Sequence, residues 1–315
     1  MALNLMNHFD FWSAVPLDGS ALAKDIAKHA NPPDEVARRV VEHALTLRLF
    51  APDGDYKVTG RVRHSCRSAA LAKSAGLSAL VSTVVDDAGA PMLATNRALE
   101  LYARGEPTLT RDMDKTAFAV YQSGGTIGNY KTPWEFIESD GEGERKGWRQ
   151  RNFVEFMRYL GEIFRLESIG GSGGHDSFNP AQRFPELSIV VEDLPKAQAG
   201  FDKHQPATMR DRDPVQADIY LIKLILHDWP DEECVKILRG LVPAMRPGAR
   251  VFFLDYVGKQ ESRDPSPMPT SIQRMGTATD LRMMALFNAE ERPAEAWQAI
   301  STLPIAASTL FAWKL

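Results

Sequence analysis

The C-terminal half of the chain combines continuous apolar runs with segments of helical periodicity. Apolar runs at 217–226 and 250–255 predict buried strands, and a shorter strand is expected at 187–193. Residues 231–245 carry apolar side chains at helical spacing, and a Pro-Gly pair ends that pattern. Strands that alternate with helices in this way predict a parallel, doubly wound α/β sheet.

Residues 20–62 follow a different order, with two helices and then a hairpin. Ser20 is expected to cap a helix through about His29, and Asn31-Pro32-Pro33 opens a second helix. A turn and two short segments at 52–63 predict a small wing. This order is typical of a winged helix, which in many proteins binds DNA.

The second of these helices has mixed charge. Arg38, Arg39 and Arg48 enrich it in positive charge, and Glu35 and Glu42 offset them. The formal net charge of −4 over 315 residues likewise gives no broad basic field for a polyanion. We therefore expect no nucleic-acid partner, and a dimerisation or substrate-lid role for the N-terminal region.

Residues 68–164 are expected to be mainly helical, and the helix at 148–163 has an apolar side. Phe153, Phe156 and Met157 lie on that side. Such a stripe usually belongs to a core, and the alternative is that it lines the pocket of an aromatic substrate. Phe153 and Met157 are therefore candidate substrate-pocket residues.

Composition narrows the class of protein. Hydrophobic residues make up 44% of the chain and charged residues 25%, which is ordinary for a soluble globular protein. The two cysteines lack the number and spacing of a zinc site or a disulfide framework, so no metal is expected. No run approaches the roughly 20 apolar residues that span a bilayer, and the N-terminus has no leader pattern. We expect a cytoplasmic location without a membrane partner.

His227 stands at the end of the apolar run 217–226, directly before a helix that opens with Pro230 and a cluster of carboxylates. In open α/β sheets, ligands bind outside the carboxyl ends of the strands. His227 is therefore a candidate catalytic base, and the alternative is a residue that only braces the next helix. Trp229 is expected to pack in this loop or to contact the substrate or an adenine ring.

A glycine-rich turn at 170–174 precedes the expected strand that ends at Asp193. Glycines allow the backbone to approach a ligand closely, and a carboxylate at the end of the next strand is placed to bind a ribose diol. This spacing predicts a cofactor that contains a nucleoside. The chain has no Gly-x-x-x-x-Gly-Lys-Ser/Thr sequence, which excludes a P-loop.

Six motifs occur in an order that is known from one enzyme family. They are Gly170-Gly-Ser-Gly-Gly174, Phe184-Pro185-Glu186-Leu187, Asp193-Leu194-Pro195, Leu226-His227-Asp228-Trp229-Pro230-Asp231-Glu232, Leu241-Val-Pro-Ala-Met-Arg-Pro-Gly248 and Asn288-Ala-Glu-Glu-Arg292. In this order the chain resembles the S-adenosylmethionine (SAM)-dependent O-methyltransferases of the caffeic-acid type, particularly their fungal secondary-metabolism branch. The resemblance covers nearly the whole chain.

The resemblance implies a Rossmann-like, SAM-binding catalytic domain at 148–315. It implies a mainly helical, winged-helix domain at 1–147 that forms a homodimer and closes the partner's pocket. The implied reaction transfers the methyl group of SAM to a hydroxyl of an aromatic or polyketide-derived small molecule.

The resemblance also assigns residues to the site. The cofactor's glycine loop falls on Gly170, Gly171 and Gly174, its ribose-binding carboxylate on Asp193, and a further cofactor contact on Lys223. The catalytic base falls on His227, with Asp255 and Glu291 as the two acids that flank it. A carboxylate bonded to one imidazole nitrogen fixes the tautomer and raises the basicity of the other nitrogen.

Two other functions stay open. Some members of this fungal branch keep SAM and catalyse pericyclic reactions of pyridone or tetramic-acid polyketides, with the cofactor's charge and basic residues as electrostatic catalysts. Lys223 would then donate to a substrate carbonyl, Met157 would form a wall of the pocket, and Ser168 stands where the methyltransferases usually have Asp. The third function is a winged-helix regulator without catalytic activity, which would bind specific DNA and not SAM.

Overall fold

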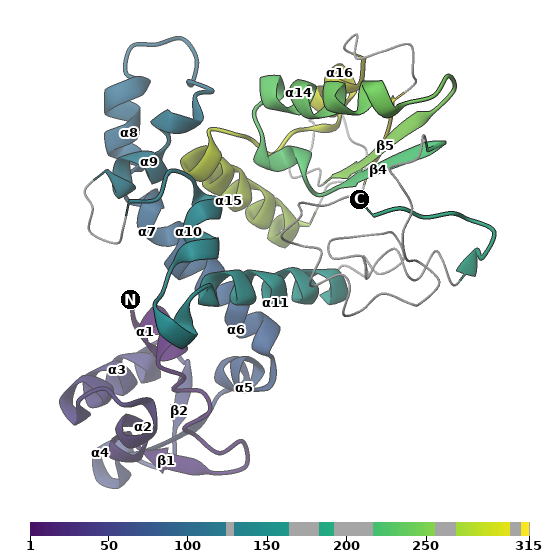
Figure 1. The fold of residues 1–315 in the computed structure, drawn as a ribbon. Helices are drawn as coiled ribbons and strands as arrows, with labels where there is room; N and C mark the ends of the chain where they lie inside the picture. Colours follow the sequence, from purple (N-terminus) through teal and green to yellow (C-terminus); the bar gives the residue numbers. More distant parts are fainter. Residues whose placement is uncertain (124–128, 164–182, 192–216, 256–268, 303–309, 315) are drawn as a thin grey trace. The chain divides into compact units, whose positions relative to one another are not determined.

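The computed structural model describes the chain except for residues 124–128, 164–182, 192–216, 256–268, 303–309 and 315 (Figure 1). The chain forms two compact units. One consists of Met1–Ala90 with Trp134–Ile163, and the other of Pro91–Pro133 with Phe164–Leu315. The sequence predicted one boundary between residues 147 and 148. The compact units divide the chain at other places, and the predicted functional division at 147/148 stays a prediction.

The N-terminal unit is mainly helical. Its helices are α1 (Ala2–His8), α2 (Ala23–Ala30), α3 (Asp34–Thr46), α4 (Tyr56–Thr59), α5 (Cys66–Lys73), α6 (Ala75–Ser82), α10 (Pro133–Ser139) and α11 (Trp148–Ile163). Its strands are β1 (Ser20–Leu22), β2 (Phe50–Pro52) and β3 (Arg61–His64), and β3 pairs antiparallel with both others. Phe11, Trp12, Phe50 and Val62 are buried in the core of this unit.

The first predicted helix begins later than the sequence suggested. Ser20 was expected to cap it, but Ser20 lies in β1 opposite Arg63, and α2 begins at Ala23 without a side-chain cap. The Ser20 hydroxyl accepts a hydrogen bond from Nε of Arg61 at 2.9 Å. This bond joins β1 to β3, so Ser20 stabilises the sheet and does not cap the helix.

The predicted wing is also built differently. Residues 56–58 were expected to form one extended segment of the wing, and they lie instead in the short helix α4. The Asp55 carboxylate accepts a hydrogen bond from the Lys57 backbone N–H, and Gly60 ends the helix with φ 63°. A side-chain cap and a left-handed glycine together favour one helical turn over a strand. The strand that pairs with β3 on this side is β2.

Helices α6 and α11 pack closely within the N-terminal unit. A Cβ atom on Gly76 of α6 would lie 2.5 Å from Cβ of Tyr159 on α11, so only glycine fits without displacement. After α6, the π-helix η1 (Thr83–Ala88) carries Asp86 and Asp87 to the buried Arg149 of α11.

The helical stretch Ala75–Tyr102 is long and apolar enough, by composition alone, to cross a membrane. A core helix of a soluble protein passes the same test. Asp86 and Asp87 of this stretch form ion pairs with Arg149 of α11 within the N-terminal unit.

The C-terminal unit contains the predicted parallel sheet. Strand β5 (Arg250–Asp255) lies between β4 (Ile219–Lys223) and β6 (Leu310–Lys314) and pairs parallel with both. The helices are α7 (Gly89–Met92), which begins at the boundary of the units, α8 (Thr95–Tyr102), α9 (Ala117–Gln122), α14 (Asp231–Leu241), α15 (Thr270–Phe287) and α16 (Ala294–Thr302). The alternation of strands and helices confirms the predicted fold class.

Helices α14 and α16 cover one face of this sheet (Figure 1). Their buried side chains, Cys234 and Leu238 from α14 with Trp297 and Ile300 from α16, pack against Val251 and Phe253 of β5. On β4, Tyr220 and Ile222 pack on the same core, whereas Ile219 and Leu221 on the opposite face are exposed.

The strand predicted at 187–193 is not formed by its described part. Residues 187–191 have no regular secondary structure, and Leu187 and Val190 are exposed. Within the described residues no neighbouring strand pairs with this segment, so its apolar side chains do not enter the core.

Candidate active site

A sharp turn after β4 places His227 beside the end of β5. The backbone N–H of Leu224 donates to the carbonyl of Leu254 at 2.8 Å, and Leu224 then adopts φ 51°. The 3₁₀-helix η8 (Leu226–Asp228) follows, with Leu226 fully buried in the core. The apolar run 217–226 is therefore a strand only as far as Lys223, and the left-handed Leu224 redirects the rest into the turn that carries His227.

Carboxylates surround His227 on several sides. Its backbone N–H donates to Oδ2 of Asp255 at 3.3 Å, and its Nδ1 lies 3.4 Å from Oε1 of Glu291. Its Nε2 lies 3.7 Å from Oδ1 of Asp228. The three predicted catalytic residues are thus brought together, from the turn after β4, the end of β5 and the loop after α15. Asp228 is a fourth member that the sequence did not assign.

The position of Glu291 depends on the end of α15. Asn288 ends this helix in the left-handed conformation, and the Glu291 backbone N–H donates to Oδ1 of Asp280 at 2.9 Å. The Glu291 side chain is 0% exposed, whereas 19% of the His227 side chain is accessible. Glu291 is therefore shielded from solvent, and an edge of the imidazole remains open to a ligand.

The carboxylates change the acid-base behaviour of His227. Burial lowers its pKa, but Asp228, Glu291 and Asp255 together outweigh burial and raise the pKa from 6.5 to about 10. Burial raises the pKa of Asp228, and the nearby His227 opposes that effect. His227 therefore rests as an imidazolium at neutral pH, and once it has lost its proton it is a strong base.

Arg292 was not assigned from the sequence, although it follows Glu291 directly. It is fully buried and donates hydrogen bonds to the carbonyls of Leu226 and Trp229 and to the carboxylate of Asp231. The available signal was a charged Glu-Glu-Arg run after an apolar helix, which usually lies on the surface. The sequence pattern therefore does not reveal that Arg292 is buried, and only the folded structure shows it.

The predicted cofactor residues are only partly described. Lys223 lies at the carboxyl end of β4 opposite Leu254, and it is half-buried. The glycine-loop residues Gly170, Gly171 and Gly174 and the acid Asp193 lie outside the described residues. Their assignment to the cofactor stays a prediction.

The predicted substrate-pocket residues lie in both units. Phe153 of α11 contacts Trp134 and Phe156 edge to face, with ring centroids 5.9 and 6.0 Å apart, and Met157 is half-buried on the same helix. Trp229 packs against the core of the C-terminal unit near Leu226. A contact of Phe153, Met157 or Trp229 with substrate stays a prediction.

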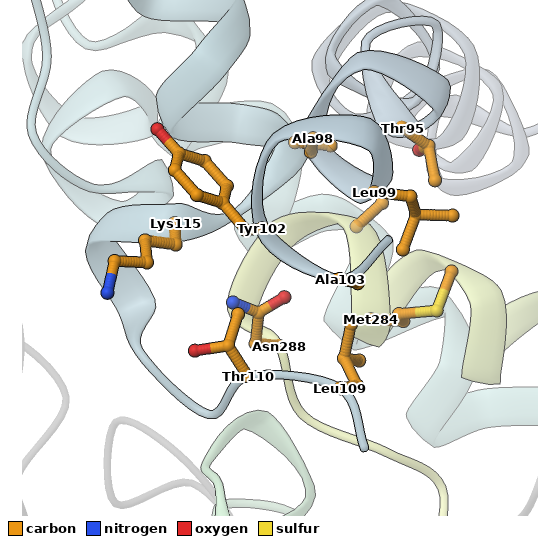
Figure 2. Close-up of a pocket in the computed structure, with 12 residues that line it drawn as sticks. Thr95, Ala98, Leu99, Tyr102, Ala103, Leu109, Thr110, Lys115, Met284 and Asn288 are labelled. Carbon is orange, nitrogen blue, oxygen red and sulfur yellow. The ribbon is translucent and has the colours of Figure 1, made fainter. Parts of the chain in front are cut away.

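A small cavity lies between α8, α9 and α15 (Figure 2). Tyr102, Lys115 and Asn288 border it together with apolar side chains such as Leu99 and Met284. Its volume is about 10 Å³, which is about the space that one water molecule needs. An aromatic substrate does not fit there, so the cavity is a gap in packing.

Comparison with known proteins identifies the family. Residues 140–303 match the model of the O-methyltransferase domain. The chain is 37% identical over 316 residues to O-methyltransferase lcsG of Purpureocillium lilacinum, and the match covers 90% of this chain and 68% of that protein. The family match and the relative together show which enzymes this chain is related to.

Solved structures support the same fold. A structure of LepI in complex with SAM, and another described as a pericyclic reaction enzyme, each match 95% of this chain and 78% of their own, with a TM-score of 0.69 at 18% identity. The mitomycin 7-O-methyltransferase MmcR matches 95% of this chain and 85% of its own, with a TM-score of 0.68 at 20% identity. At these identities the likeness shows a class I, Rossmann-like methyltransferase fold. With the domain match and the lcsG relationship, the chain belongs to the family of SAM-dependent O-methyltransferases.

Proposed function

We propose that this protein transfers the methyl group of SAM to a hydroxyl of an aromatic or polyketide-derived small molecule, with His227 as the general base. The observation that carries the proposal is the contact of Nδ1 of His227 with the shielded Glu291, while part of the ring stays accessible. A base whose ring is held by a carboxylate on one nitrogen and remains partly accessible is suited to remove a hydroxyl proton.

SAM supplies an electrophilic methyl group on a positively charged sulfur. With SAM bound, the substrate oxygen would form the bond to this methyl carbon as the carbon–sulfur bond breaks, and the electron pair would leave on the sulfur of S-adenosylhomocysteine. The hydroxyl proton goes to Nε2 of neutral His227, because Nδ1 faces Glu291. The resulting imidazolium is stabilised by Asp228, Glu291 and Asp255, the same carboxylates that raise its pKa.

The position of Lys223 supports this proposal. Lys223 stands at the end of β4, and the turn that carries His227 begins at the next residue. A predicted cofactor contact and the predicted base therefore lie at the same end of the sheet, where ligands of open α/β sheets bind. Gly170, Gly171, Gly174 and Asp193 would hold the rest of the cofactor.

The substrate class is inferred from side chains of α11 and from relatives. The aromatic cluster of Trp134, Phe153 and Phe156 offers ring faces and edges for a flat, aromatic acceptor. MmcR is described as acting on mitomycin, and lcsG is a fungal O-methyltransferase. A homodimer in which the N-terminal unit closes the partner's pocket, and a cytoplasmic location, are parts of the same proposal.

The test is mass spectrometry of reactions that contain SAM and a panel of phenolic and hydroxypyridone polyketides. Methylated product with an equal amount of S-adenosylhomocysteine is the expected result. Turnover of substrate without S-adenosylhomocysteine would contradict methyl transfer.

One observation favours a second candidate, a SAM-dependent pericyclic reaction. Because its pKa is raised to about 10, His227 rests as a cation and can polarise a substrate carbonyl without taking a proton. Lys223 would assist, and Met157 would line the pocket. In the same assay this function gives an isomer or a dehydrated product, and SAM is not consumed.

A further inference from the structure

Arg292 is buried beside the proposed base and donates hydrogen bonds on several sides. Only 1% of its side chain is exposed. Its two terminal nitrogens donate to the carbonyls of Leu226 at 3.2 Å and Trp229 at 2.7 Å. Nε and Nη2 also donate to Oδ1 of Asp231, at 2.9 and 2.6 Å. One planar guanidinium therefore joins three points of a short segment.

The two carbonyls lie on either side of His227 and Asp228. A guanidinium has its donors in a rigid fork, so it fixes the separation of the groups it binds. Because Arg292 holds the carbonyls of Leu226 and Trp229, the backbone of His227 between them has little conformational freedom. Glu291, the residue next to Arg292, contacts the imidazole ring itself. Two adjacent residues thus hold the backbone and the ring of the base.

We propose that Arg292 is a positioning residue for methyl transfer: it clamps the turn 226–229 so that the imidazole of His227 stays against Glu291. Arg292 acts through this turn, since its side chain is 1% exposed and it donates to Leu226, Trp229 and Asp231. The inference rests on the proposed function for its role in the reaction. The clamp itself rests on the hydrogen bonds of Arg292.

The pKa of His227 depends on how closely the turn 226–229 holds its imidazole against Glu291. The imidazole is faced by Asp228 from its own turn, by Asp255 from β5 and by Glu291 from the loop after α15. Arg282 of α15 acts on Asp228 and on Glu291. If the turn relaxes, His227 moves away from Glu291, and its pKa falls toward the ordinary value.

A merely structural role would have a different signature. Arg292 also lies over the ring of Trp297, at 4.9 Å from the centroid, and this contact stabilises the core. Loss of such packing lowers the melting temperature, but in a folded protein it leaves the titration of His227 unchanged. The two roles are therefore separated by the pKa of one side chain.

The experiment compares Arg292→Lys and Arg292→Gln with the wild-type protein. Lysine keeps the positive charge, but its single ammonium does not reproduce the rigidly spaced donors of the guanidinium. If Arg292→Gln does not fold, Arg292→Lys still allows the pKa of His227 and kcat to be measured. The matched control is Arg111→Gln, since Arg111 binds the carbonyl of Asn288 and the carboxylate of Glu290 in the same loop without touching the turn 226–229.

Two quantities are measured: the pKa of His227 by NMR of ring-labelled histidine, and kcat and KM for SAM. Both Arg292 variants are expected to lower the pKa of His227 by about one pH unit or more. They should also lower kcat, compared at the high-pH plateau where His227 is neutral, by about 10- to 100-fold, with KM for SAM changed little. Arg111→Gln is expected to match the wild type in both.

An Arg292→Lys protein that is folded, with the wild-type His227 titration and kcat, would overturn the clamp. The NMR titration also separates this inference from the proposed function. If the wild type methylates no substrate but the Arg292 variants still lower the pKa of His227, the clamp stands and methyl transfer is refuted.

Discussion

Replacing Glu291 by glutamine tests the electrostatics of the site directly. Glutamine keeps the length of the side chain and an oxygen that can accept from Nδ1, but it removes the negative charge. The charge lies 3.4 Å from His227, and with an effective dielectric constant of about 20 Coulomb's law gives about 5 kcal/mol, or about 3.6 pH units, as the upper limit of its effect.

The expected effect of Glu291→Gln is smaller than this limit. Asp228 and Asp255 remain beside the ring and continue to stabilise the imidazolium. We expect the pKa of His227 to fall by about two pH units, toward its ordinary value. In the wild type kcat should rise with pH far above 6.5, because the neutral imidazole is the reacting form, and in Glu291→Gln the rise should come at lower pH.

The assay is the pH profile of kcat, measured together with an NMR titration of His227. Glu290→Gln is the matched control, because the neighbouring Glu290 pairs with Arg111 and does not contact His227. Profiles of Glu291→Gln and wild type that coincide would refute the reasoning, since the buried charge of Glu291 would then have no effect on the pKa of His227.

Three further changes have defined outcomes. His227→Ala should lower kcat by at least about 100-fold without weakening the binding of SAM, measured by calorimetry; a loss of SAM affinity comparable to the loss of kcat would contradict a base. Burial, opposed by Arg149, raises the pKa of Asp87 from 3.8 to about 7, so its contribution to stability is complete below pH 3.8 and is lost as the pH rises through 7. Asp87→Asn should flatten this part of the pH dependence in urea unfolding, and an unchanged slope would count against it. Gly76→Ala should destabilise the fold by about 1–3 kcal/mol in thermal unfolding through its clash with Tyr159, whereas Gly161→Ala, which meets nothing within 4 Å, should not destabilise it.

The parallel sheet was predictable because its signal is local. The apolar runs that became β4 and β5, and the helix between them, each carry a hydrophobic period that belongs to one element. The resemblance to the O-methyltransferases implied that Asp255 flanks His227. The structure confirms that proximity through the backbone N–H of His227.

Other parts depend on contacts between distant segments, which no local pattern contains. Ser20 has the residue type of a helix cap, but Arg61 recruits its hydroxyl to the sheet. The apolar run before His227 gives no sign that Leu224 turns to φ 51°. Arg292 looks like a surface residue in the sequence, and only the fold shows two carbonyls and Asp231 around it.

The resting charge of His227 has a consequence for cofactor binding. If His227 is the base, the substrate hydroxyl would lie between the imidazole and the methyl group, and the positive sulfur of SAM would then be near the imidazole. Two positive charges repel, and binding of SAM should lower the pKa of His227 from its raised value of about 10. Because this drop makes the imidazolium lose its proton, SAM binding at neutral to mildly basic pH should release protons.

S-adenosylhomocysteine is the matched ligand for this prediction, since its sulfur carries no charge. Calorimetry in buffers of different ionisation enthalpy counts the protons released by each ligand. SAM should release up to about one proton per site and bind more tightly as the pH rises, by up to about tenfold per pH unit, while S-adenosylhomocysteine should release almost none. In His227→Gln the difference between the two ligands should vanish. Equal proton release by SAM and S-adenosylhomocysteine in the wild type would show that the cofactor's charge does not act on this histidine. In that case His227 would have to lose its proton by another route before it could act as the base.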